Sequence, residues 1–183
     1  MSVDVPGEIA GSEVATTGTK RTGAHWLVFL GTAVTVFVLD QISKAWLVSN
    51  LKPGETVRVI GDFVRLTFSQ NSGALFGLFR DNALVFGIVS LVVVALIVGY
   101  HARAGRSLYL SLALGLLLGG ALGNLADRLR LGYVVDFVDI GLGTLRFFTF
   151  NVGDSAITLA ILMLIAAAIF PTLSGVGDRS ADG

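Results

Sequence analysis

The chain contains four apolar segments, each close to the length that an α-helix needs to cross a membrane. They span residues 26–48, 83–100, 108–126 and 154–170, whereas a crossing helix needs about 20 residues. Charged residues make up only 14% of the sequence, compared with about 25% in a soluble domain. The sequence therefore predicts an all-α membrane protein with four transmembrane helices.

Composition and charge also exclude some functions. The chain has no cysteine, which excludes disulfides, thiolate metal sites and a cysteine nucleophile. The net charge is zero and no basic run is present, so we expect no nucleic-acid partner. Residues 1–23 and 172–183 are polar and are predicted to be disordered tails. Four spans would place both tails on one side, but the Lys and Arg distribution leaves the orientation open.

Two connections between the apolar segments have the composition of β-structure. Residues 56–68 are rich in β-branched and aromatic residues on both sides of Gly61-Asp62, which indicates a short hairpin. Residues 144–150 form a second such run, just before the fourth apolar segment. Because an open sheet edge is not tolerated in hydrocarbon, we expect a small sheet at the membrane interface, over the ends of the helices.

Polar residues gather in one part of this apolar chain, residues 123–155. Ionisable groups at the edge of a hydrocarbon layer are costly, so each requires a partner or a function. The third apolar segment carries four glycines between positions 115 and 123, whose spacing favours close helix packing. It then ends in Asn124, Asp127 and Arg128, a denser polar cluster than a surface ion pair would require.

Two carboxylates in this stretch stand in apolar surroundings. Asp136 lies within residues 133–138, and Asp154 opens the fourth apolar segment. If they meet within about 3 Å they share one proton, because both cannot be ionised. The ionised carboxylate then activates water and the protonated one polarises a carbonyl. The structural alternative is that Asp154 caps a helix and that Asp136 pairs with Arg128 or Arg146. Spacing leaves both interpretations open.

Other polar residues also have two interpretations. Asp40 and Lys44 are four residues apart on one helix face, where they either meet lipid headgroups or support a site. The loop 70–77 is either an ordinary turn or a polar loop in which Asn71 binds an adjacent backbone. On an extended chain Asp139 would point away from Asp136, so it is left out of the site.

In chain order, five motifs resemble those of the lipoprotein signal peptidase (signal peptidase II) family of intramembrane aspartyl peptidases. They are DQISK at 40–44, NSGA at 71–74, GNLADR at 123–128, VDF at 135–137 and FNVGDS at 150–155. Each motif is short, but their order on four apolar segments is specific, and the resemblance covers residues 26–171. Gly153 stands where the family commonly has Ala.

The resemblance implies an aspartic endopeptidase, a hydrolase that works without a metal or other cofactor. It would remove signal peptides from bacterial prolipoproteins that carry a lipobox and a diacylglyceryl-modified Cys, cutting just before this Cys. The implied catalytic pair is Asp136 and Asp154. Residues implied to line the site are Asn71, Gly73, Asn124, Arg128 and Asn151. Residues implied to support it are Asp40, Lys44 and Asp127.

The resemblance also implies an architecture and a location. A peptidase domain over residues 24–171 would contain the four helices and a small β-cradle, formed by about residues 55–70 and 144–150. The cradle and the active site would lie at the outer face of the cell membrane, with both termini in the cytoplasm. The expected partners are prolipoproteins and membrane lipid, and the chain is expected to be a monomer.

One alternative from another class is a small proton-coupled transporter that uses Asp136, Asp154 and Arg128 as a relay. Relay carboxylates are expected near the middle of the membrane, whereas these lie at the ends of apolar segments. A further alternative, a noncatalytic scaffold packed through the glycines, leaves the polar cluster unexplained. The sequence therefore favours the peptidase.

Overall fold

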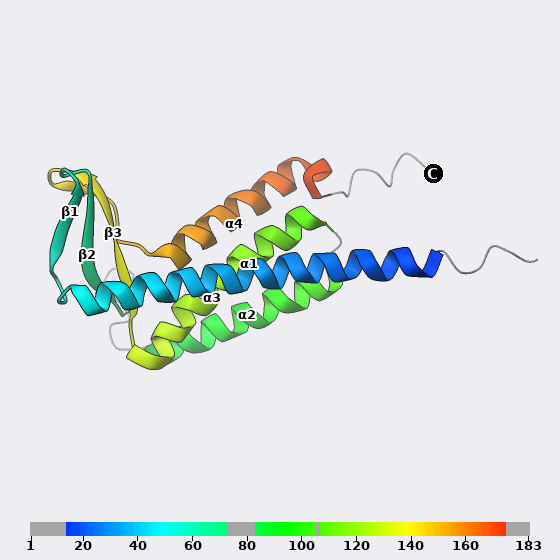
Figure 1. Cartoon of the computed structure of the whole chain (residues 1–183), viewed down its shortest axis with the longest axis horizontal. Helices are drawn as coiled ribbons and strands as arrows, with labels where there is room; N and C mark the ends of the chain where they lie inside the picture. Colours follow the sequence, from blue (N-terminus) through cyan, green and yellow to red (C-terminus); the bar gives the residue numbers. More distant parts are fainter. Residues whose placement is uncertain (1–13, 73–82, 105–106, 175–183) are drawn as a thin grey trace, which may run out of the picture.

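The computed structural model describes residues 14–72, 83–104 and 107–174, which form four α-helices and a four-stranded antiparallel sheet. The helices are α1 (Val14–Asn50), α2 (Ala83–Ala104), α3 (Leu108–Leu131) and α4 (Val152–Ile169), followed by the 3-10 helix η1 (Pro171–Ser174). The helices run alongside one another, and the sheet lies at one end of them (Figure 1). Helix α3 contacts each of the other three helices.

The helices match the predicted apolar segments closely. In the described part of the chain, three helical stretches are long and apolar enough to cross a membrane: Gly23–Asn50 of α1, α3 and α4. The apolar part of α2, Gly87–Arg103, is shorter. Helix α1 begins at Val14 and so extends into the stretch predicted to be a disordered tail, because no proline separates this stretch from the apolar segment.

The sheet has the strand order β1-β2-β3-β4. Strands β1 (Thr56–Ile60) and β2 (Val64–Asn71) form the predicted hairpin, and β3 (Val134–Leu142) pairs with β2. The structure corrects the strand predicted over residues 144–150. Only β4 (Leu145–Arg146) pairs there as a strand, and Phe150 forms a single bridge with Val138.

Glycines allow α3 to approach its neighbours closely, as the sequence predicted. A Cβ atom at Gly115 would lie 2.6 Å from the carbonyl oxygen of Phe29, and one at Gly119 would lie 2.6 Å from that of Ala33. Both distances are far below van der Waals contact, so the backbones of α1 and α3 meet where α3 has no side chain. This contact holds the end of α3 beside α1.

Two apolar clusters anchor the elements around the polar residues. One joins α1, α2 and α3 through residues that include Phe29, Ile97 and Leu118. The other packs β2 and β3 on the end of α1 and includes Leu47 and Phe68. The second cluster therefore fixes the sheet at the end of the helices.

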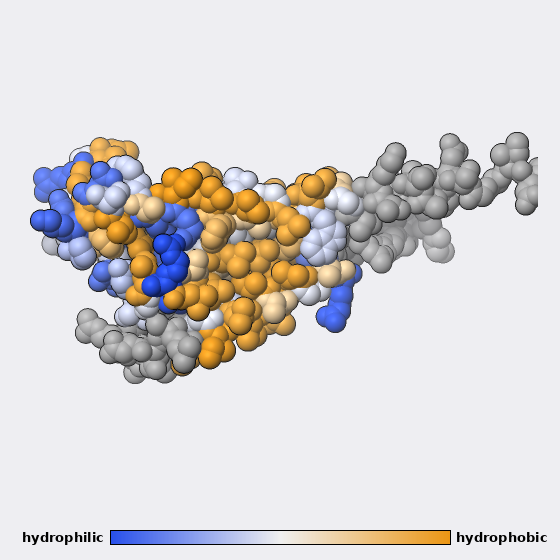
Figure 2. Space-filling model, turned by 60° about the horizontal axis from the view of Figure 1, so that its bottom comes forward, coloured by the Kyte–Doolittle hydropathy of each residue, from blue (hydrophilic) through white to orange (hydrophobic). Residues whose placement is uncertain are grey.

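The outer surface of the helices is apolar. Figure 2 shows hydrophobic residues over the helices, whereas hydrophilic residues are concentrated towards the sheet. The exposed apolar side chains include Val34 on α1, Leu96 on α2 and Leu162 on α4, each at least 59% exposed. An apolar surface of this extent is typical of a protein surrounded by lipid.

Candidate active site

Six of the polar residues singled out in the sequence are buried together where α1, α3, β3 and the start of α4 meet. These residues are Asp40, Lys44, Asn124, Asp127, Asp136 and Asn151. Asn71, Arg128 and Asp154 lie beside them and are more exposed. Gly73 lies outside the described residues. The fold therefore gathers side chains that are more than 100 positions apart in the sequence.

Lys44 is at the centre of this group. Its Nζ atom lies 2.7 Å from Asp40 Oδ2 and 2.9 Å from Asp127 Oδ2, and it donates a hydrogen bond of 2.9 Å to Asn124 Oδ1. An ammonium group has three donors, so all three are used. The predicted pairing of Asp40 with Lys44 is confirmed, and the pair is buried in the protein instead of facing lipid headgroups. Burial of this lysine requires such partners.

Two amides connect the candidate catalytic carboxylates. Asn124 Nδ2 donates to Asp154 Oδ1 at 2.8 Å, and Asn151 Nδ2 donates to Asp136 Oδ1 at 2.7 Å. The amides also contact each other, because Asn151 Nδ2 donates to Asn124 Oδ1 at 3.2 Å. Both aspartates are therefore oriented by a single network of side-chain hydrogen bonds.

Asp154 also stabilises the start of α4. Asn151 is the N-cap, and its Oδ1 atom accepts the backbone N–H of Asp154 at 2.8 Å. In return, Asp154 Oδ2 accepts the N–H of Asn151 at 3.3 Å, which completes a capping box. The helix-cap interpretation of Asp154 is thus correct, and the same carboxylate also faces the site through Asn124.

Asp136 lies on β3 with only 2% of its surface exposed. Its pKa is raised to about 6, mainly by burial and in part by the nearby charge of Asp154, against the hydrogen bonds from Asn71 and Asn151 and the charge of Lys44. The bond from Asn71 Nδ2 to Asp136 Oδ2 is 2.9 Å long. A carboxyl group in this state holds its proton at a higher pH than an exposed aspartate does.

The two arginines considered as structural partners of Asp136 lie in different surroundings. Arg146 Nε donates to Asp139 Oδ1 at 2.6 Å, and Arg146 also binds the backbone carbonyl of Asp62. Arg146 therefore links β3 to the turn between β1 and β2. Arg128 Nη1 donates to the backbone carbonyl of Asn124 at 3.3 Å, and its charge acts on both Asp154 and Asp136.

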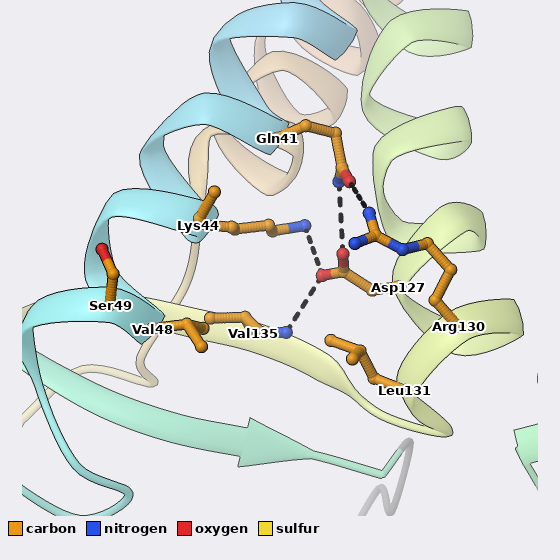
Figure 3. A pocket seen from close by; sticks show the side chains of 9 residues that line it. Gln41, Lys44, Val48, Ser49, Asp127, Arg130, Leu131 and Val135 are labelled. Carbon is orange, nitrogen blue, oxygen red and sulfur yellow. Dashed lines mark hydrogen bonds and ion pairs between the residues drawn. The ribbon is translucent and has the colours of Figure 1, made fainter.

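Sequence reasoning missed the contribution of Gln41. Its Nε2 atom donates to Asp40 Oδ2 and to Asp127 Oδ1, both at 3.2 Å, and its Oε1 atom accepts from Arg130. Gln41, Asp127 and Arg130 also line a cavity of about 280 Å³ (Figure 3). The signal in the sequence was the position of Gln41 within the DQISK motif, next to Asp40.

The chemistry available to the site is acid–base chemistry. Two carboxylates with different surroundings are held by one network, and such a pair can supply an acid and a base at the same pH. Over residues 14–72, 83–104 and 107–174, no three His, Asp or Glu side chains are grouped so that they could hold a metal ion. Fold and site together define a membrane protein in which one buried polar network holds two carboxylates.

Comparison with known proteins then assigns the family. Residues 32–170 match the family model described as Signal peptidase (SPase) II, so the chain belongs to the signal peptidase II family. The lipoprotein signal peptidase of Moorella thermoacetica is 41% identical over 144 residues, which cover 78% of this chain and 93% of that protein. The lipoprotein signal peptidase of Staphylococcus aureus strain Newman is 33% identical over 153 residues, or 81% and 94% of the two chains.

Solved structures agree with the sequence comparisons. One is described as a bacterial membrane enzyme structure obtained by the in meso method at 2.3 Å resolution. It is 32% identical, has a TM-score of 0.72, and the match covers 82% of this chain and 90% of that chain. A second, obtained at 1.9 Å resolution, is 31% identical with a TM-score of 0.72 and covers 81% and 94%. The family is one of bacterial membrane peptidases, and nothing in these comparisons supports the transporter alternative.

Proposed function

We propose that this chain is an aspartic endopeptidase that cleaves diacylglyceryl-modified prolipoproteins just before the lipidated Cys, with Asp136 and Asp154 as its catalytic dyad. The observation that carries the proposal is the shared amide network. Asp136 binds Asn151, Asp154 binds Asn124, and these two amides bind each other at 3.2 Å. The substrate class is taken from relatives that are lipoprotein signal peptidases.

The two aspartates differ in ways that assign their roles. Asp136 is the more buried and has the raised pKa, so it holds the proton that the dyad shares. Asp154 accepts two N–H donors at a helix N-terminus, so it is the ionised partner. Asp154 takes a proton from water as the water oxygen attacks the scissile carbonyl. Asp136 donates a hydrogen bond to that carbonyl oxygen, and the proton on Asp154 then passes to the leaving amine.

The remaining residues have supporting roles in this proposal. Asn71 donates to Asp136 and so helps to fix the acid. Arg128, beside both aspartates, supplies positive charge near the oxygen that becomes negative during attack. Asn71, Gly73, Asn124, Arg128 and Asn151 are proposed to line the substrate site, and Asp40, Lys44 and Asp127 to support it.

The proposal extends to the membrane. All four helices are proposed to span it, α2 included, with the sheet as a β-cradle at the extracytoplasmic surface and both termini in the cytoplasm. The site at the sheet end of the helices would then meet a prolipoprotein whose acyl chains remain in the lipid. The enzyme is proposed to act as a monomer without a cofactor.

The test is cleavage of a diacylglyceryl-modified prolipoprotein peptide by the purified protein in detergent. Asp136→Asn and Asp154→Asn are each expected to lower the cleavage rate by at least about 1,000-fold, because each removes one proton-transfer group. Asp139→Asn, on the same strand as Asp136, is the matched control and is expected to retain most of the activity. An unlipidated peptide should be cut far more slowly.

Full activity of either dyad variant would overturn the catalytic assignment. Equal cleavage of the lipidated and unlipidated peptides would instead overturn the proposed substrate. Each variant is compared with the wild type by thermal unfolding, so that loss of fold is not mistaken for loss of chemistry.

A further inference from the structure

We infer that Lys44 is a positioning residue that sets the separation of Asp136 and Asp154, because it joins two buried carboxylates that each hold the backbone just before one of these aspartates. The inference rests on the proposed function, since it concerns the spacing of the proposed dyad. It assigns to Lys44 a geometric role that extends beyond neutralising the charge of Asp40.

The backbone contacts on the two sides are equivalent. Asp40 Oδ1 accepts the N–H of Gly153 at 2.8 Å, and Gly153 immediately precedes Asp154. Asp127 Oδ2 accepts the N–H of Val135 at 3.1 Å, and Val135 immediately precedes Asp136. Figure 3 shows the second of these contacts, in which Lys44 and the backbone N–H of Val135 meet at the same oxygen of Asp127. Each dyad aspartate therefore follows a backbone group that is fixed by a buried carboxylate.

Lys44 connects the two sides. Its ammonium group lies 2.7 Å from Asp40 and 2.9 Å from Asp127, with the side chains at most 4% exposed. Its third donor binds Asn124, whose amide holds Asp154 directly. The Lys44 ammonium group thus links α1 to Asp127 on α3, which binds the backbone of β3. It also links α1 to Asn124 on α3, which binds Asp154 in the first turn of α4. A shift of Lys44 would therefore move both aspartates.

Close packing limits the movement of Lys44 and the groups that it contacts. A Cβ atom at Gly123 would overlap the carboxylate of Asp40. One at Gly153 would lie 3.1 Å from Asn151 Oδ1 and 3.2 Å from Asp40 Oδ1. Protein interiors packed to this degree transmit small displacements instead of absorbing them. The contacts of Lys44 therefore determine geometry as well as charge.

The charge of Lys44 has an effect on the pH dependence of activity that can be measured separately from its effect on geometry. The charged groups that act on Asp136 are Lys44 from α1, Arg128 from α3 and Asp154 from α4, and Lys44 in turn pairs with Asp40 and Asp127. Lys44 lowers the pKa of Asp136. Without its charge, Asp136 keeps its proton to higher pH, so the alkaline limit of activity moves upward. A residue that only fills space would leave this limit unchanged.

The first test compares pH–rate profiles on the lipidated peptide. Lys44→Met is expected to lower kcat about 100-fold, the usual effect of a misplaced catalytic group, with little change in KM and an alkaline limit at higher pH. The double variant Lys44→Met/Asp40→Asn restores the original charge, so its alkaline limit should return while kcat stays low. Lys52→Met, at an exposed position, is the control and should behave as wild type.

The second test does not require Lys44→Met to fold. Asp40→Asn and Asp127→Asn weaken the two sides separately, and their effects on kcat are measured singly and together. Independent supports would give additive changes in log kcat, whereas groups coupled through Lys44 give non-additive ones. Additive effects, or wild-type kcat in a folded Lys44→Met protein, would overturn the inference.

The two proposals fail in different ways. If Asp136→Asn and Asp154→Asn are inactive but the Lys44, Asp40 and Asp127 variants have wild-type kcat, only the positioning role of Lys44 is wrong. If the dyad variants are active, the proposed function is wrong, whatever the Lys44 variants show.

Discussion

Burial of Asp136 lowers the free energy of unfolding at neutral pH. Its pKa is about 6 in the fold against an ordinary value of 3.8. Between about pH 4 and pH 6, the folded protein therefore binds a proton that the unfolded chain releases. The free energy of unfolding falls as the pH rises through this window and stays at the lower value above it. The residue that we propose as the acid thus destabilises the fold at neutral pH.

This relation predicts that Asp136→Asn stabilises the protein while abolishing its activity. At pH 7.5 the gain is expected to approach about 3 kcal/mol, the free-energy equivalent of a shift from 3.8 to about 6. The gain should disappear towards pH 4, where the wild-type carboxyl is protonated in both states. Thermal unfolding in detergent across this pH range measures it.

The control for this prediction is Asp139→Asn. It removes the charge that pairs with Arg146, so it should lower the unfolding temperature at pH 7.5. An Asp136→Asn protein that is no more stable than wild type at pH 7.5, or whose advantage persists at pH 4, would contradict the prediction.

At the scale of the elements, the helices depend on the glycine face of α3. Gly119→Ala would place a Cβ atom 2.6 Å from the carbonyl oxygen of Ala33, so α1 and α3 must separate. Overpacking of this kind usually costs about 1–3 kcal/mol, and the unfolding temperature should fall accordingly. Gly31→Ala is the matched control, because a Cβ atom at Gly31, on α1, meets no atom within 4 Å. Equal stability of the two variants would contradict close packing at Gly119.

The sequence predicted the elements unequally, for physical reasons. Helices α2, α3 and α4 were predicted to within a few residues because continuous apolar runs are a strong local signal, whereas α1 begins well before its apolar run, at Val14. Strand β3 was not predicted, because Asp136 and Asp139 interrupt the alternation typical of a strand. Residues 147 and 148 have strand composition, but only their neighbours Leu145–Arg146 pair as β4. Strand pairing depends on partners far along the chain, and composition does not contain that information.

The site was predicted only in part, because many of its contacts join residues that are far apart in the sequence. Motif resemblance named the polar residues, and local spacing predicted the pairing of Asp40 with Lys44. The contacts of Lys44 with Asp127, and of Asp40 with the backbone of Gly153, join α1 to elements more than 80 positions away. Only the fold reveals such contacts. Gln41 was missed because most of its contacts are with residues far away in the sequence.

For the whole molecule, the apolar surface and the sheet at one end predict a defined orientation in the membrane (Figures 1 and 2). The chain has no cysteine, so single cysteines can report it. Leu145→Cys, on the sheet, is expected to react with a membrane-impermeant thiol reagent in intact protoplasts. Leu173→Cys, in η1, should react only after lysis. Both positions are exposed.

The opposite labelling pattern would reverse the proposed orientation. Labelling of both positions in intact protoplasts would contradict a membrane crossing by α4, the helix that lies between them. The cysteine-free wild type is the control for background reaction, and cleavage activity of each variant confirms that it has folded.

Asn151 has a consequence for inhibition. Its carbonyl oxygen caps α4, while its amide nitrogen binds Asp136 and Asn124. Ser, Thr and Asp cap helices nearly as well as Asn, but none of them carries an amide donor. A replacement that preserves the helix therefore loses the contact with Asp136. A compound that binds this side chain would leave bacteria few resistance mutations at position 151 that still process lipoproteins.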